Sequence, residues 1–276
     1  MTIGIGVLCS TLPKPHVPHP DAMILISDII DSIDADPENE LRKMYVYPDE
    51  KLFCVCVGRF DKSGDLLPAI QREFQELTTR NQATFTEALN RVVYNHRAQH
   101  FHFDVLPNYY FATEDIPPDQ HQNVTDAWQR YNVGVHVLVG TFDEHGQALM
   151  YVIAQIEGFD GWVHRALFPG VATIGVGAHS ARAWLDYRRQ VPSRSVRQSA
   201  YQAYEARRIL AKTPSLNANL EMVLATNEKV FHLTGEAPEL EGCPFSFPEL
   251  EKMFEKYGPR DTSQDLGHSE SQTAVA

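Results

Sequence analysis

Apolar and polar positions divide the chain into short strands and longer amphipathic helices. Short apolar runs bounded by turn-forming residues are typical of buried β-strands. Such runs predict strands at about 2–9, 22–28, 43–48, 52–58, 133–142, 147–156, 220–226 and 229–233, with one or two more before Gly175. Apolar residues three and four apart predict two helices, one with Leu66, Ile70 and Phe74 on its buried face and one with Phe85 and Leu89. Further helices are predicted at about 179–190, 194–212 and 247–257.

This order of strands and helices favours one α+β domain at 1–257. The strands are apolar on both sides, which two antiparallel sheets between two helix layers would satisfy, since each sheet then has one face for the other sheet and one for helices. Periodicity alone permits other α+β arrangements. The segment 104–131 is rich in Pro, Asp, Gln and Asn and is predicted to be an irregular insertion. The polar stretch 258–276 is predicted to be a disordered tail.

Composition narrows the kind of protein. With 276 residues, 43% of them hydrophobic, the chain can bury a full core. Its net charge is −12, and no Lys/Arg run accompanies an aromatic patch, which argues against nucleic-acid binding. The four cysteines lack C-x-x-C spacing, and three lie in predicted buried strands, so reduced thiols are expected. With no basic leader and no apolar stretch of the roughly 20 residues that span a bilayer, a cytoplasmic protein without a membrane partner is predicted.

The first two apolar runs bring the start of the chain beside an acidic residue. If they pair as an antiparallel hairpin, the chain returns to its starting point and Asp28 lies beside Thr2. Only Met1 precedes Thr2, and removal of an initiator methionine before a small residue would expose the Thr2 amine. A hydroxyl and an amine on one residue, next to a carboxylate, suggest an N-terminal nucleophile.

The residues that follow resemble, in their order, the proteasome-type N-terminal-nucleophile hydrolases, particularly the bacterial members HslV and Anbu. The family pattern is a threonine at the mature N-terminus, a strand ending in aspartate, an Arg-Lys pair opening the next strand and an apolar strand ending in glycine. The matching positions are Thr2, Asp28, Arg42, Lys43 and Gly58, with Ser32 four residues after the aspartate. Later strands resemble the family's central hairpin, and the ordered matches extend to about Leu233. No single piece is specific, so the ordered series carries the resemblance.

The resemblance implies a fold and an activity. The implied fold is α+β, a four-layer αββα sandwich with two antiparallel sheets between helix layers. The implied activity is hydrolysis of peptide bonds by Thr2 in a self-assembled homo-oligomer, a ring or a helical stack. Peptides or unfolded proteins would be the substrates, and an unfoldase ATPase is a further partner that such a chamber can have. No cofactor and no metal are implied.

The resemblance also assigns roles to residues. The α-amine of Thr2, with a reference pKa of about 7.7–8.0, would take the hydroxyl proton and return it to the leaving amine. Lys43 would supply positive charge beside the hydroxyl, while Asp28 would pair with Lys43 and offset the cost of burying it. Ser32 would add a hydrogen bond or orient a bound peptide, and N–H groups around Gly58 would stabilise the oxyanion.

Other readings of these residues stay open. Thr2 alone is more often a frayed terminal residue, Asp28 could cap a turn, and Lys43 could be a surface lysine. Cys56 could form a wall of the binding pocket, although packing in the core is the simpler account.

The chain also departs from the family pattern. Val176 stands where the family has a serine between two glycines, and the segment 213–219, where an Asp and a Ser are expected, contains no acid. Ser215 or Asn217 could act there as hydrogen-bonding groups.

Two alternatives to the peptidase therefore remain: an inactive proteasome-like scaffold or binding subunit, and a small-molecule amidase of the same class. Retained Met1 would support the first, and a monomer or dimer in size-exclusion chromatography would favour the second.

Histidines are densest at His96, His100 and His102, followed by Asp104. His96 and His100 are four residues apart, so they share a helical face and could hold a metal, but no carboxylate or cysteine completes a clear signature. A place at the surface or under the insertion is expected, and no metal site is predicted. The charged runs at 186–189 and 205–208 are predicted to be solvated helix faces or subunit contacts.

Overall fold

The computed structural model describes residues 3–11, 19–28, 43–109, 116, 118–154, 162–166, 169–210, 220–234 and 240–259. Three parts of the predicted site, Thr2, Ser32 and the segment 213–219, lie outside these described residues. The same holds for residues 260–276 of the predicted tail.

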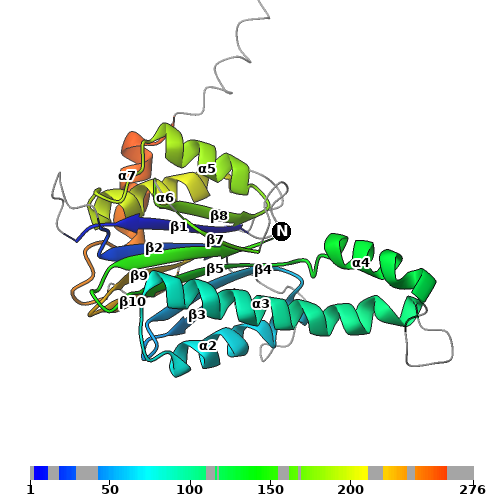
Figure 1. Cartoon of the computed structure of the whole chain (residues 1–276). Helices are drawn as coiled ribbons and strands as arrows, with labels where there is room; N and C mark the ends of the chain where they lie inside the picture. The colour runs from blue at the N-terminus through cyan, green and yellow to red at the C-terminus, as the bar shows by residue number, and fades with distance from the viewer. Residues whose placement is uncertain are drawn as a thin grey trace, which may run out of the picture.

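The described strands form two five-stranded antiparallel sheets (Figure 1). The first sheet has the order β10-β9-β2-β1-β8 and is built from β1 (Ile3–Cys9), β2 (Ala22–Asp28), β8 (Val171–Gly175), β9 (Leu220–Thr226) and β10 (Val230–Thr234). The second sheet has the order β3-β4-β5-β6-β7 and is built from β3 (Met44–Tyr47), β4 (Leu52–Gly58), β5 (Val135–Phe142), β6 (Ala148–Ile153) and β7 (Val163–Arg165).

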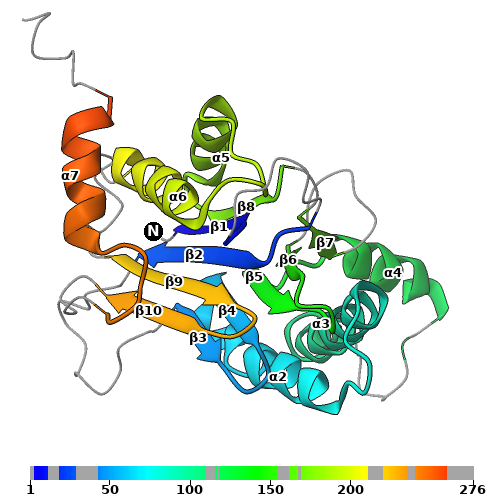
Figure 2. The ribbon, with the colours of Figure 1, turned by 90° about the vertical axis from the view of Figure 1, so that its left-hand side faces the viewer.

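Helices cover the outer face of each sheet, as Figure 2 shows. The first sheet is covered by α5 (Ala178–Tyr187) and α6 (Val196–Leu210), and α7 (Phe247–Tyr257) packs against α6. The second sheet is covered by α2 (Leu66–Glu76) and α3 (Gln82–Asp104), preceded by the short α1 (Phe60–Ser63). The remaining helical segments are η2 (Leu106–Asn108), η3 (Pro118–Gln120) and α4 (His121–Arg130). Within the described part of the chain, no helix combines the length and the apolar character needed to cross a membrane.

Strand alternation explains why these strands are apolar on both sides. In β1, Ile3 and Ile5 face the core beneath α5 and α6, whereas Leu8 faces the second sheet. In β4, Cys54 faces α2 and α3, whereas Val55 faces the first sheet. The protein therefore has three stacked cores, one between the sheets and one under each helix layer. This arrangement confirms the α+β four-layer sandwich.

Glycines in β1 allow the two sheets to approach closely. A Cβ placed on Gly6 would lie 2.4 Å from Sδ of Met150 and 3.0 Å from a methyl group of Leu138, both in the second sheet. We therefore expect Gly6→Ala to lower the free energy of unfolding by about 1–3 kcal/mol through overpacking, measured by urea unfolding. Gly64→Ala is the matched control, because Gly64 has helical backbone angles and its Cβ would meet no atom within 4 Å. Equal stability of Gly6→Ala and the wild type would contradict this account of the sheet contact.

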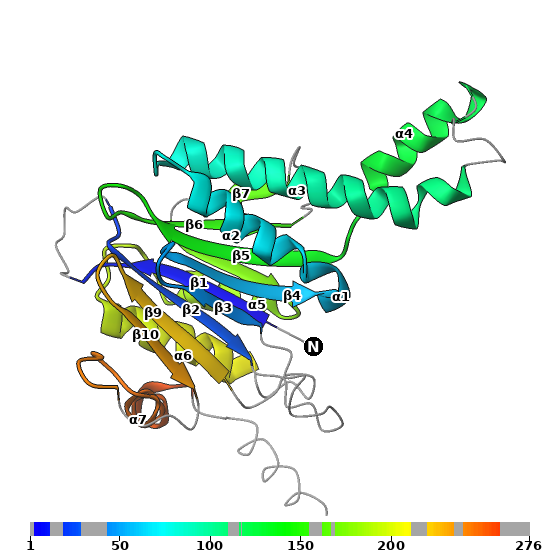
Figure 3. The same cartoon turned by 90° about the horizontal axis from the view of Figure 1, so that it is seen from below.

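The segment 104–131 differs from the predicted irregular insertion. It contains α4, which lies alongside the end of α3 where that helix extends beyond the sheets (Figure 3). The indole of Trp128 packs against the ring of Phe101, with 5.1 Å between the ring centroids, and the guanidinium of Arg97 lies 4.1 Å from the Trp128 centroid. The composition of this segment is mostly polar and did not predict a helix, because the preceding helix α3 provides the apolar and aromatic contacts of α4.

Candidate functional site

The hairpin of β1 and β2 places a carboxylate beside the first described residue. The two strands pair from Gly4↔Ser27 to Cys9↔Ala22, so Asp28 stands at the same end of the sheet as Ile3. The N–H of Ile3 donates a hydrogen bond to Oδ1 of Asp28 at 2.9 Å. Asp28 is 1% exposed. It lies on the same face of β2 as Ile24 and Ile26, which pack in the core beneath α5 and α6. A carboxylate is thus held in a dry environment at the start of β1.

Lys43 completes a buried ion pair with this carboxylate. Its Nζ donates to Oδ2 of Asp28 at 2.8 Å, and both side chains are 1% exposed. The carbonyl oxygen of Lys43 accepts a hydrogen bond from the N–H of Cys56 at 2.8 Å, which fixes the entry to β3 against β4. Buried pairs of this kind contribute little net stability, although loss of one partner is strongly destabilising. A surface position for Lys43 was an alternative that the sequence allowed, and it is wrong.

Arg207 of α6 is a further charge at this place, and it is not among the residues predicted for the site. Its side chain is 1% exposed, and its charge interacts with both Asp28 and Lys43. Burial lowers the pKa of Lys43, the hydrogen bond and the charge of Asp28 oppose this shift, and the charge of Arg207 adds to it. Asp28 therefore faces two buried cations. The available signal was the helical spacing of Ala203, Arg207 and Leu210, which puts the arginine on the buried face of α6.

The prediction that 205–208 is a solvated helix face or a subunit contact is wrong for Glu205 as well as for Arg207. Glu205 is 0% exposed and accepts hydrogen bonds from Nε1 of Trp184 at 3.0 Å, from Nε of Arg188 at 2.6 Å and from the hydroxyl of Tyr201 at 2.9 Å. The carboxylate is stable there because three donors replace its hydration. This cluster joins α5 to α6.

Gly58 and Cys56 both lie near the end of β4, where Gly58 is required by the backbone and Cys56 packs in a core. Gly58 has φ +104°, and a Cβ there would lie 2.1 Å from the carbonyl oxygen of Gly134, so only glycine fits. Cys56 packs in the core beneath α2 and α3 and hydrogen-bonds to Ser63, and burial raises the pKa of its thiol to about 11. Core packing is therefore the account of Cys56 that the structure supports, and not a wall of a binding pocket.

The turn before α5 lies at the same end of the first sheet. Ile3 pairs with Gly175, so the Gly175-Val176-Gly177 turn begins at the residue opposite Ile3. Val176 is 46% exposed, and Gly177 has φ +83° where α5 begins. The position that carries serine in the family pattern is therefore next to the Asp28 end of the hairpin.

Two stacked antiparallel sheets between helix layers define a sandwich with the proteasome-subunit type of fold. Solved structures share it. An Anbu Gly-1 mutant from Hyphomicrobium sp. strain MC1 aligns over 100% of both chains, with a TM-score of 0.58 and 10% identity. Anbu from Yersinia bercovieri, an ancestral beta-subunit, covers 99% of this chain and 98% of its own, with a TM-score of 0.58 and 11% identity. No protein-family model and no curated protein matches the sequence. At such identities the likeness shows a shared fold.

Proposed function

We propose that the chain is a threonine-type peptidase whose nucleophile is Thr2, freed by removal of Met1. The observation that carries the proposal is the hydrogen bond from Ile3 to the buried Asp28–Lys43 pair. The nitrogen of Ile3 belongs to the peptide bond that joins Ile3 to Thr2. Asp28 of the ion pair therefore accepts a hydrogen bond from the backbone directly after the proposed nucleophile. Because such a pair gives little net stability, its presence beside the first residue of β1 favours a chemical role.

In the proposed mechanism the Thr2 amine transfers protons, and Lys43 and Asp28 stabilise charge. The free α-amine of Thr2 takes the proton from the Thr2 hydroxyl as the oxygen attacks the peptide carbonyl, and gives it to the leaving amine. An ester on Thr2 forms as the peptide bond breaks, and water then hydrolyses that ester. The charge of Lys43 favours the attacking alkoxide, and Asp28 acts against the lowering of the Lys43 pKa by burial and by Arg207.

Gly58 is proposed to stabilise the oxyanion through its backbone. Successive N–H groups of a strand point to opposite sides, and the N–H of Cys56 points to Lys43. The N–H of Gly58, two residues on, is therefore directed to the same side of β4 as Lys43, at the end of the strand. A backbone donor in a low-dielectric site is the usual means of stabilising a tetrahedral oxyanion. Ser32 is proposed to assist the nucleophile or to orient the peptide.

The proposed setting follows the resemblance. Anbu from Yersinia bercovieri is an ancestral beta-subunit, so we propose that this chain also works as a homo-oligomer, a ring or a helical stack in the cytoplasm. Peptides or unfolded proteins would be its substrates, and an ATPase could supply them. No metal or other cofactor takes part in the proposed reaction.

Val176 favours one alternative, a proteasome-like subunit without activity, because a supporting hydroxyl is missing beside the Asp28 end of the hairpin. If the chain is an active peptidase, Val176→Ser should raise kcat/KM for fluorogenic peptides by roughly 2–10-fold, the effect of one added hydrogen bond. Val176→Ala is the matched control, because it shortens the side chain without adding a hydroxyl. No hydrolysis by either the wild type or Val176→Ser would favour the inactive subunit.

A further inference from the structure

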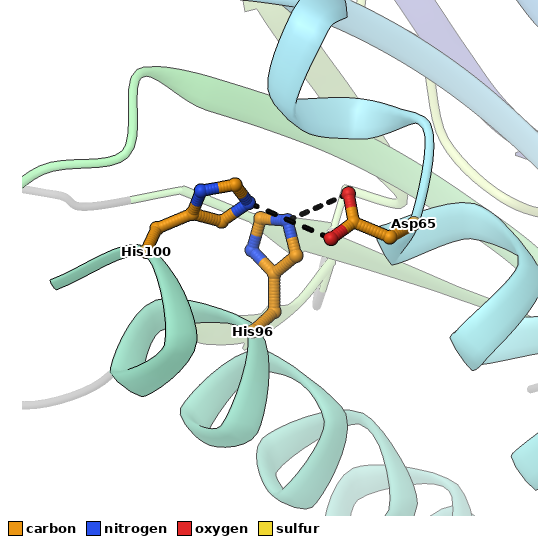
Figure 4. A group of neighbouring side chains, drawn as sticks. All are labelled: Asp65, His96 and His100. Atoms are coloured by element: carbon orange, nitrogen blue, oxygen red, sulfur yellow. Dashed lines mark ion pairs between the residues drawn. The ribbon is translucent and has the colours of Figure 1, made fainter. Parts of the chain in front are cut away.

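A second group of chemically capable side chains lies on the other helix layer, between α2 and α3. His96 and His100 stand one turn apart on α3, and Asp65 is the N-cap residue of α2. Figure 4 shows both imidazole rings turned toward the Asp65 carboxylate. The pair of histidines was visible in the sequence, but the carboxylate that joins them was not, because it comes from a different helix.

The distances between the donor atoms suit a bridging metal ion better than direct hydrogen bonds. Nε2 of His96 lies 3.8 Å from Oδ1 of Asp65, and Nε2 of His100 lies 3.7 Å from Oδ2. Both separations exceed hydrogen-bond length. Ligands bonded to a tetrahedral zinc ion at about 2.0–2.1 Å lie about 3.4 Å from one another, so these side chains would draw somewhat closer together around an ion. One ligand atom from each residue fits within 4.8 Å of the others.

The burial of the two histidines gives a separate indication. Nε2 of His100 is shielded from solvent and, within the described part of the chain, has no hydrogen-bond partner. A buried ring nitrogen without a partner is costly, and a metal ion would satisfy it. His96, the neighbouring ring, is 8% exposed, so both imidazoles lie largely out of solvent.

One contact must change for an ion to bind through Nε2 of His96. That nitrogen lies 2.7 Å from the carbonyl oxygen of Lys62, so it carries the proton of this hydrogen bond. Binding would turn the ring away from this carbonyl oxygen and move the proton to Nδ1, the other tautomer of the same neutral ring, which frees the lone pair of Nε2. A surface hollow of about 190 Å³, lined by Asp65, His96 and Gln99 among others, gives an ion a path to the cluster.

We propose that Asp65, His96 and His100 form a site for a divalent ion of the zinc class, with water in the fourth position. Two imidazoles and one carboxylate are a donor set that zinc and cobalt accept, whereas magnesium and calcium prefer oxygen ligands. The ion would link the start of α2 to the middle of α3. Asp65 follows Gly58 by seven residues through α1, so the site would brace the segment that leaves the end of β4. This inference is independent of the proposed peptidase.

The test is Co²⁺ binding to the full-length protein after treatment with a chelator. We expect visible absorption bands that saturate at one Co²⁺ per chain and disappear when Zn²⁺ is added in competition. His100→Ala should weaken binding by more than roughly 100-fold, because loss of a ligand exceeds the 10–100-fold effect of losing an outer-shell partner. Asp65→Asn is the second variant, since the half-exposed Asp65 side chain can be changed with little effect on folding.

His102→Ala is the matched control, because His102 is an exposed histidine of the same helix and lies outside the cluster. It should bind Co²⁺ as the wild type does. Absence of Co²⁺ bands in the wild type would overturn the proposal. Wild-type binding by Asp65→Asn and His100→Ala, or an equal loss of binding in His102→Ala, would overturn it too.

Discussion

Lys43→Met is expected to lower peptide hydrolysis by roughly 10²–10³-fold or more, because it removes the charge proposed to stabilise the alkoxide of Thr2. It also leaves Asp28 buried without its closest cation, a change that typically costs about 3–5 kcal/mol. Arg207 still faces Asp28, so we expect a loss near the lower end of that range. Hydrolysis of fluorogenic peptides and urea unfolding measure the two effects, with the assay run at a temperature where circular dichroism shows the variant folded.

Lys252→Met is the matched control for Lys43→Met. Because Lys252 is exposed on α7, this substitution should change neither peptide hydrolysis nor the free energy of unfolding.

Asp28→Asn tests the same ion pair by changing its acidic partner. It keeps the size of the side chain and removes the charge that raises the pKa of Lys43, so we expect a comparable loss of hydrolysis. Unchanged hydrolysis in Lys43→Met would remove this lysine from the mechanism.

The second large effect is expected at Thr2. Thr2→Ala keeps a small residue after Met1, so removal of the methionine and the free amine should be preserved while the hydroxyl is lost. Loss of a nucleophile lowers turnover by several orders of magnitude, and we expect at least a roughly 10³-fold decrease in kcat. Thr2→Ser retains the hydroxyl and should keep measurable hydrolysis, so the pair isolates the role of that oxygen. An active Thr2→Ala variant would show that another group performs the attack.

The sheets could be predicted because their pattern is local. Each strand carries its own alternation, as the opposite directions of Cys54 and Val55 show, and the equal arms of β1 and β2 fixed the register that brings Asp28 to Ile3. The prediction that Asp28 and Lys43 lie together depended on the family resemblance, since nothing in the local pattern connects β2 to the start of β3.

Features that depend on contacts between distant segments could not be predicted. The run 205–208 is predicted to be a solvated helix face or a subunit contact because charged residues on helices are usually exposed. Only the packing of α6 on the first sheet and on α5 buries Arg207 and Glu205. Asp65 precedes α2, whereas the two histidines that it joins lie on the next helix, α3. Helix α4 gains its stability from Phe101 and Arg97 of α3 and not from its own composition. In each case the deciding contact is with a partner that the local pattern of the segment does not reveal.

The central claim is that Thr2 is a free N-terminal nucleophile, and one measurement tests it most directly. The purified protein is incubated with a peptide-based electrophile, such as a β-lactone, and its intact mass and the modified residue are determined by mass spectrometry. The account predicts a chain that has lost Met1 and carries one adduct on Thr2, with no adduct in Thr2→Ala. A chain that retains Met1, or one whose adduct lies on another residue, would contradict the claim.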